Sequence, residues 1–164
     1  MRMVRKLLRF LRSLEYSTKI REEFPKLKVI MALNFPTFFK YLTSILQNLF
    51  TVLFYLSDHR VFLSEIGVIQ KQHAVTHYPR SMKFYFLQNL FGVLNNLVKM
   101  SLEVLKNQSD AYENIKKFAF DLIKCLLDCL VALYYLNGGL GAKKTGIVGV
   151  ITSIMGIIQS LGFM

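Results

Sequence analysis

The feature that most constrains this chain is an uncharged, proline-free segment at its end, residues 145–164, which reads TGIVGVITSIMGIIQSLGFM. A helix of about 20 mainly apolar residues is long enough to cross the hydrocarbon core of a bilayer, and soluble domains rarely end in such a segment. Lys143 and Lys144 directly precede it, as is typical of a helix that enters lipid from the positively charged side. The pattern predicts a C-terminal transmembrane helix, with a glycine-containing core helix of a soluble protein as the alternative.

Small residues recur at every fourth position of this segment, in two rows. Small side chains at that spacing let two helix backbones approach closely, which favours association where burial from water cannot drive it. We therefore predict that both rows form helix-packing faces. The rows consist of Thr145, Gly149 and Ser153, and of Thr152, Gly156 and Ser160.

Composition also favours a membrane protein. Of the 164 residues, which suit one domain, 53% are hydrophobic, and the mean hydropathy of +0.37 is high for a soluble protein. Lys and Arg total 21 against 10 Asp and Glu, a net charge of +11. Basic proteins commonly bind nucleic acid or an anionic membrane, and the hydrophobicity favours the anionic phospholipid membrane. The two cysteines, Cys125 and Cys129, indicate a reducing compartment rather than a disulfide framework.

Residues 1–20 predict an amphipathic helix. At about 100° per residue, the apolar side chains from Val4 to Leu14 fall within one arc, and the basic side chains fall on the opposite side. Such a helix suits the headgroup plane of a bilayer, with leucines in the acyl boundary and arginines at lipid phosphates, where it favours curvature. The predicted membrane-binding residues are Arg2, Val4, Arg5, Lys6, Leu7, Leu8, Arg9, Phe10, Leu11, Arg12 and Leu14.

Two alternatives stay open for this N-terminal segment. The helix could pack on its own protein and leave its basic side in water. Its arginine-rich start without acidic residues is also typical of a mitochondrial transit peptide. A secretory signal is not expected, because the basic residues are not followed by a long apolar core and a cleavage site of small residues.

Three further helices are expected between the two ends. Glu22, Glu23 and Pro25 interrupt the helical pattern, and a turn at Tyr78 and Pro79 closes a predicted loop. We predict an all-α fold, a membrane-associated bundle of four to five helices in a single domain over residues 1–164. Its parts are the amphipathic helix (1–20), apolar helices at 38–69 and 80–105, a helix at 111–136 and the transmembrane helix at 145–164.

Motifs for catalysis or for bound cofactors are not found. The sequence has no phosphate-binding glycine loop, no dinucleotide-binding glycine fingerprint, no nucleophile elbow and no cysteine–histidine cluster. His73 and His77 would supply half of a zinc site, and no acid or cysteine lies close to them in sequence. We therefore predict no catalytic, cofactor-binding or metal-binding residues, and a protein that is not an enzyme.

Four stretches together resemble a known family. RKLLRFLRSLEYSTKI at 5–20 is similar to a basic amphipathic segment, and NLFTVLFYLSDHRVFLSEIGVI at 48–69 is similar to an apolar helix that ends near a glycine. Residues 80–98 are similar to an aromatic-rich middle helix. The most specific block lies within 121–158, where GIVG is followed closely by ITSI. These stretches resemble the peroxin-11 family of peroxisomal membrane proteins.

The resemblance implies a non-enzymatic protein of the peroxisomal membrane. It implies that the chain promotes membrane elongation, proliferation and fission through amphipathic-helix insertion and self-association into a homo-oligomer. It also implies a dynamin-like GTPase and its tail-anchored fission adaptor as partners, with no cofactor and no nucleic acid. Two other functions stay open, a structural subunit of a mitochondrial membrane complex and a pore or transport protein of the peroxisomal membrane. The polar path of such a pore would contain Gln47, Asn48, Asn95, Asn96, Asp121 and Asp128.

Overall fold

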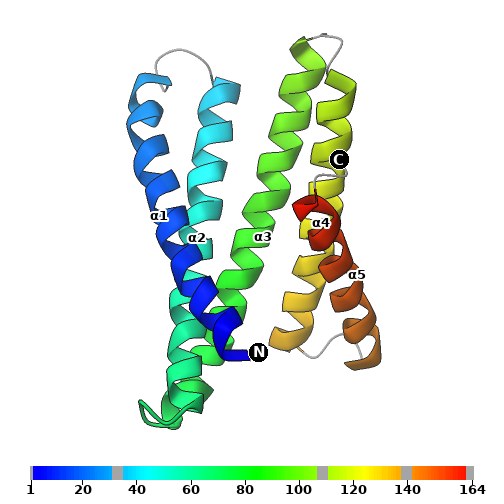
Figure 1. Cartoon of the computed structure of the whole chain (residues 1–164). Coiled ribbons are helices and arrows are strands. Elements are labelled where there is room, and N and C mark those ends of the chain that lie inside the picture. The colour runs from blue at the N-terminus through cyan, green and yellow to red at the C-terminus, as the bar shows by residue number, and fades with distance from the viewer. Residues whose placement is uncertain (1, 31–34, 107–110, 138–141, 162–164) are drawn as a thin grey trace.

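In a computed structural model of the chain, the described residues form five helices and no strand, which confirms the all-α fold class (Figure 1). The helices are α1 (Arg2–Ile30), α2 (Phe35–Glu65), α3 (Gln72–Lys106), α4 (Ala111–Asn137) and α5 (Ala142–Ser160). The structure describes residues 2–30, 35–106, 111–137 and 142–161, and it describes side chains for 11–27, 35–105, 111–137, 145–159 and 161.

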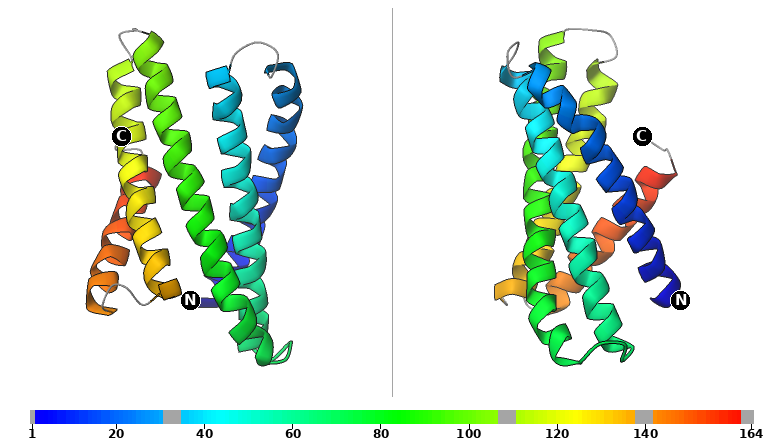
Figure 2. Two further views of the ribbon diagram at one scale, coloured as in Figure 1. Left: turned by 180° about the vertical axis from the view of Figure 1, so that it is seen from behind. Right: turned by 90° about the vertical axis from the view of Figure 1, so that its left-hand side faces the viewer.

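Each helix packs against its neighbours in the chain: α1 on α2, α2 on α3, α3 on α4 and α4 on α5. Helices α2, α3 and α4 form a layer, and α1 and α5 lie over the same side of that layer at its two edges (Figure 2). Among the described residues, α1 and α5 do not contact each other. The side of the layer that they flank is therefore only partly covered.

Helix α2 ends at Glu65, before the predicted end at residue 69. Gly67 has a φ of 80°, a left-handed conformation that favours glycine because glycine has no Cβ. The amides of Gly67 and Val68 donate to the carbonyls of Ser64 and Leu63 over 3.2 and 2.9 Å, the pattern of a Schellman helix end. The predicted helix thus included the glycine that terminates it.

Two prolines that were expected to interrupt helices lie inside them. Helix α1 continues through Pro25 to Ile30, and α3 begins at Gln72 and continues through Pro79. A proline within a helix removes one backbone hydrogen bond and crowds the preceding turn. Both prolines are exposed, so this loss falls on the outer side of each helix, and packing against α2 supports the residues on either side.

The predicted transmembrane helix is not supported. Helix α5 has 19 residues and includes Lys143 and Lys144, which were expected to precede the apolar segment. Thr145, Thr152 and Gln159 lower its apolarity further. Within the described parts of the chain, no helix has both the length and the apolarity that crossing a bilayer requires. The last part of the predicted span, 162–164, lies outside the described residues.

The interior of the bundle is polar and its surface is rich in apolar side chains. Thr43 and Ser81 are 2% and 0% exposed, whereas Leu97, Ile123 and Ile154 are 46%, 51% and 51% exposed. Exposed leucine or isoleucine side chains occur on every helix of the described structure. An apolar surface this extensive marks contact with a membrane or with other proteins.

The three central helices approach each other closely at Gly92 of α3. A Cβ at this position would lie 2.8 Å from the Cys125 sulfur of α4 and 3.0 Å from the Gln47 side-chain nitrogen of α2. Interiors are close-packed, so a larger residue would have to displace these neighbours. One turn further along α3, the Asn95 amide donates to the Gln47 side-chain oxygen over 3.1 Å. A glycine and a polar pair therefore set the spacing of the layer.

We expect Gly92→Val to lower the free energy of unfolding by about 1–3 kcal/mol, the usual cost of overpacking. Thermal unfolding followed by circular dichroism measures this loss. The control is Gly146→Val in α5, where an added Cβ meets no atom within 4 Å. Adding Cys125→Ala to Gly92→Val should restore part of the loss, because the sulfur is the nearest atom. Equal melting temperatures for the Gly92 and Gly146 variants would contradict the close approach.

Candidate functional site

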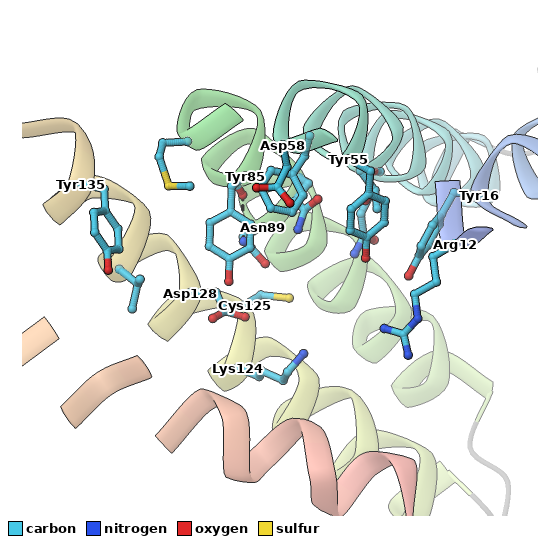
Figure 3. Close-up of a pocket in the computed structure, with 16 residues that line it drawn as sticks. Arg12, Tyr16, Tyr55, Asp58, Tyr85, Asn89, Lys124, Cys125, Asp128 and Tyr135 are labelled. Carbon is cyan, nitrogen blue, oxygen red and sulfur yellow. Dashed lines mark hydrogen bonds between the residues drawn. The ribbon is translucent and has the colours of Figure 1, made fainter. Parts of the chain in front are cut away.

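A cleft of about 510 Å³ opens between α1, α2, α3 and α4 (Figure 3). Its volume and its converging polar groups are typical of sites that bind small molecules. Helix α1 contributes to the wall, so the cleft lies on the side of the layer where α1 packs. Its charged residues and tyrosines are Arg12, Asp58, Lys124 and Asp128, and Tyr16, Tyr55, Tyr85 and Tyr135.

Asp128 of α4 and Tyr85 of α3 form the deepest polar contact of the cleft. Asp128 is only 8% exposed, and its carboxylate accepts a hydrogen bond from the Tyr85 hydroxyl. Burial and the nearby Asp128 charge raise the pKa of Tyr85, so its hydroxyl stays protonated and can donate. The Asn89 amide donates to the Tyr85 carbonyl over 2.8 Å, and the Phe54 ring centroid lies 5.1 Å from that of Tyr85. These contacts fix the tyrosine in place.

Two basic side chains face the same cleft. Arg12 reaches toward it from α1, and Lys124 lies on α4 one turn before Asp128 (Figure 3). Among the described residues, neither base forms a salt bridge with Asp128. The cleft therefore contains two acids, Asp58 and the buried Asp128, and two bases, neither of which forms a salt bridge with Asp128 within the described part of the chain.

Helix α1 turns its leucine side away from the bundle. Leu11 and Leu14 are each 54% exposed, whereas Ser13 is buried and the Tyr16 ring centroid lies 6.1 Å from that of Tyr55 on α2. Arg12 lines the cleft and remains exposed to solvent there. Of the predicted site residues, those whose side chains lie outside the described set are Arg2, Val4, Arg5, Lys6, Leu7, Leu8, Arg9, Phe10 and Ser160.

The two small-residue rows of α5 divide between two sides of that helix. Thr145 and Thr152 are 4% and 8% exposed, and a Cβ at Gly156 would lie 3.6 Å from a lysine side chain of α4. Ser153 is exposed, and a Cβ at Gly149 would meet no atom within 4 Å. The first row thus packs on α4 at Thr145 and is open at Gly149 and Ser153, whereas the described residues of the second row, Thr152 and Gly156, pack on α4.

The residues expected along a polar path are distributed over different environments. Gln47 and Asp128 line the cleft. Asp121 instead accepts a hydrogen bond from the Gln159 amide of α5, and burial raises the pKa of Asp121. The three asparagines of the expected path are buried, and Asn95 bonds to Gln47. The helices therefore use most of these groups to contact one another.

The two histidines of the expected loop lie on α3 as a stacked pair. The ring centroids of His73 and His77 are 6.0 Å apart. Burial lowers the pKa of His77, and the positive charges of Arg60 and Arg80 lower it further. Within the described residues, no group of three or more His, Cys, Asp or Glu side chains is placed to hold a metal ion.

The cleft is not apparent in the amino-acid sequence. Tyr16, Tyr55 and Tyr85 come from three different helices, and no spacing along the chain connects them. Lys124 and Asp128 are four residues apart, which places them on one side of a helix but does not show what that side faces. Only the packing of α1 on α2 and of α3 on α4 brings these groups together.

Residues 1–161 match the family model of peroxisomal biogenesis factor 11 (PEX11), which covers nearly the whole chain. The chain belongs to the PEX11 family. The resemblance to the peroxin-11 family is therefore confirmed. The PEX11 family acts in the proliferation and division of peroxisomes, is associated with the peroxisomal membrane, and is not a known family of enzymes. Comparison with curated proteins and with solved structures gives no match.

The two thiols of α4 should react slowly in this PEX11 protein. Burial raises the pKa of Cys125 to about 12 and that of Cys129 to about 11. Because the thiolate is the nucleophile, alkylation by iodoacetamide at pH 8 should be about a hundredfold slower in the folded protein than after denaturation. Mass spectrometry of the alkylated protein measures both rates.

The control for this labelling is Ser101→Cys, which places a thiol at an exposed position of α3. That thiol should react in the folded protein at nearly the rate of a free cysteine. The native thiols should gain about tenfold in rate per pH unit while they remain mostly protonated. Fast labelling of Cys125 at pH 8 would contradict the burial of this wall of the cleft.

Proposed function

We propose that this PEX11 family protein elongates and divides the peroxisomal membrane by inserting the leucine side of α1 into one leaflet. The observation that carries the proposal is the 54% exposure of both Leu11 and Leu14 on a helix whose other side packs on α2. Transfer of each leucine from water into acyl chains would gain about 1.5–3 kcal/mol if burial were complete. A helix inserted into one leaflet widens that leaflet and favours curvature.

The rest of the surface supports a membrane setting. Lys99, Asp121 and Asp128, which lie in the inner parts of α3 and α4, are at least half-buried, and burial lowers the pKa of Lys99. Leu90 and Leu130, on the same two helices, are 38% and 43% exposed. Exposed apolar groups on these helices suit contact with the acyl chains at a membrane surface. The net charge of +11 adds attraction to anionic headgroups.

The double variant Leu11→Glu, Leu14→Glu should abolish tubulation of anionic liposomes, because carboxylates do not enter the acyl region. Electron microscopy gives the number of tubules, and flotation gives the fraction of protein bound. The matched control is Val104→Glu, Leu105→Glu at the end of α3, where the side chains are 64% and 76% exposed. It adds the same charge to an exposed apolar pair and should tubulate like the unmodified chain.

Circular dichroism should show the same helix content in both double variants, so that unfolding does not explain a loss. Tubulation by the α1 variant at the level of the control would contradict the insertion of α1. Loss of tubulation in both variants would also contradict it, since the effect would then belong to the apolar surface in general.

We further propose that α5 provides the face for self-association. In the described structure α5 packs on α4 alone, and on its open side Ile147, Val150 and Ile154 are 56%, 59% and 51% exposed. Gly149 and Ser153 lie beside these residues and would let a second helix approach closely. This arrangement supports contact between the α5 helices of two copies.

Gly149→Leu should weaken self-association about tenfold, the effect of roughly 1.4 kcal/mol of lost packing. Energy transfer between copies labelled with donor and acceptor dyes, reconstituted in vesicles, measures the association. The control is Ser101→Leu, which adds the same side chain at an exposed position of α3, away from α5. Unchanged energy transfer in the Gly149 variant would exclude this face.

A further inference from the structure

A second pocket, of about 240 Å³, lies between α2 and α3. Helix α2 lines it with positions 53, 56, 57 and 60, and helix α3 lines it with positions 77, 80 and 84. Both sets have the spacing of three or four residues that places side chains on one face of a helix. Of these seven described side chains, Arg60, His77 and Arg80 are basic and none is acidic. Unlike the cleft beside α1, this pocket therefore presents charge of one sign.

The basic groups of this pocket lie close enough to act on each other. His77 is only 9% exposed, and its ring stacks on that of His73. Burial lowers the pKa of His77, and the positive charges of Arg60, Arg80 and His73 lower it further. Among the described residues, neither arginine forms a salt bridge, and Asp58, two residues before Arg60, lines the other cleft. An anion in the pocket would offset this concentration of positive charge.

The pocket is basic toward one end and apolar toward the other. Helices α2 and α3 run in opposite directions on either side of the turn at 66–71 (Figure 1). Arg60 and His77 are the lining residues nearest to that turn in sequence, and Leu53 and Phe84 are the farthest. A free phosphate ion would contact only the basic end. The gradient instead matches an amphiphile with an anionic head near the turn and hydrocarbon along the apolar end.

The turn beside the basic end has the features of a membrane contact. It projects past the ends of the other helices (Figure 1), and Ile66, Val68 and Val75 there are 42%, 66% and 78% exposed. Exposed apolar side chains together with basic ones suit the surface of an anionic bilayer. The pocket is also smaller than the roughly 300–1,000 Å³ of sites that enclose a small molecule. A lipid whose chains stay mostly in the bilayer meets both conditions.

We propose that the pocket between α2 and α3 binds a phospholipid with a phosphomonoester headgroup, such as phosphatidic acid. A phosphomonoester carries about 1.5–2 negative charges near pH 7 and has three strong acceptor oxygens, which suits several converging donors. Arg60 and Arg80 hold the phosphate, each with a guanidinium that can donate two parallel hydrogen bonds. His77 donates from its imidazole, and the first part of an acyl chain lies along Leu53 and Phe84.

The test is flotation of the full chain with phosphatidylcholine vesicles that contain phosphatidic acid or phosphatidylglycerol, adjusted to equal surface potential. We expect about tenfold tighter binding to phosphatidic acid. Arg60→Gln and Arg80→Gln should each weaken that binding about tenfold, the effect of losing one charge-assisted contact. The matched control is Lys83→Gln, which removes the same charge from an exposed position of α3 outside the pocket and should keep the preference.

All three of these substitutions replace exposed side chains, so the fold should persist, and circular dichroism verifies it. Equal binding of the unmodified chain to both kinds of vesicle would overturn the proposal. Arginine variants that behave like Lys83→Gln would overturn it as well. The Leu11→Glu, Leu14→Glu variant should keep the preference for phosphatidic acid, because those leucines lie on α1. Failure of α1 insertion and failure of this pocket are therefore distinguishable.

The imidazole of His77 gives a second readout, which also separates a lipid from a free anion. Short-chain phosphatidic acid should raise the pKa of His77, because a nearby anion favours the protonated ring. NMR titration of the full chain measures this pKa, with His77→Asn to assign the resonance. An unchanged pKa at saturating lipid would overturn the site. Inorganic phosphate at the same concentration should leave the pKa unchanged, and an equal effect of both compounds would overturn the assignment to a lipid.

Discussion

The structure depends on the close approach of α2, α3 and α4 at Gly92. The absence of a side chain there lets the Cys125 sulfur and the Gln47 amide meet the α3 backbone. Asp128 lies one turn beyond Cys125 on α4, so the spacing that Gly92 permits also brings Asp128 to the Tyr85 hydroxyl. A wider layer would separate the acid from its donor. The geometry of the cleft is thus a consequence of how closely these three helices pack.

Polar packing of this kind has an energetic consequence for the whole bundle. Hydrogen bonds such as that from Asn95 to Gln47 specify how helices fit together, but each contributes only about 0.5–1.5 kcal/mol in water. Few large apolar side chains are buried, among them Phe54 and Val61, and many are exposed, such as Leu97 and Ile123. A membrane or a second protein in contact with the bundle would bury part of that surface. The stability of this PEX11 protein and its membrane contact are therefore expected to be coupled.

Sequence reasoning identified what depends on local periodicity and missed what depends on packing. The amphipathic pattern of α1 is visible in the sequence because it needs only a regular helix. Two predicted helix ends were wrong. Tertiary contacts let α1 continue through Pro25, and the left-handed conformation of Gly67 ends α2 earlier than predicted. The predicted transmembrane helix was also wrong. Helix α5 begins before the predicted start and includes two lysines, and the last predicted residues lie outside the described part of the chain. The cleft joins four helices, and a single sequence contains no signal for such a combination.

The two sides of α1 face the cleft and the outside of the bundle. Leu14 points outward, while Tyr16, two residues later, packs on Tyr55, so one rigid helix presents different chemistry in two directions. Near its other end the helix is tied to α2 by the Ser44 hydroxyl, which donates to the Glu23 carboxylate over 3.1 Å. These contacts fix the rotation of α1 about its own axis. If the leucines enter a leaflet as proposed, the bundle sets the direction in which they do so.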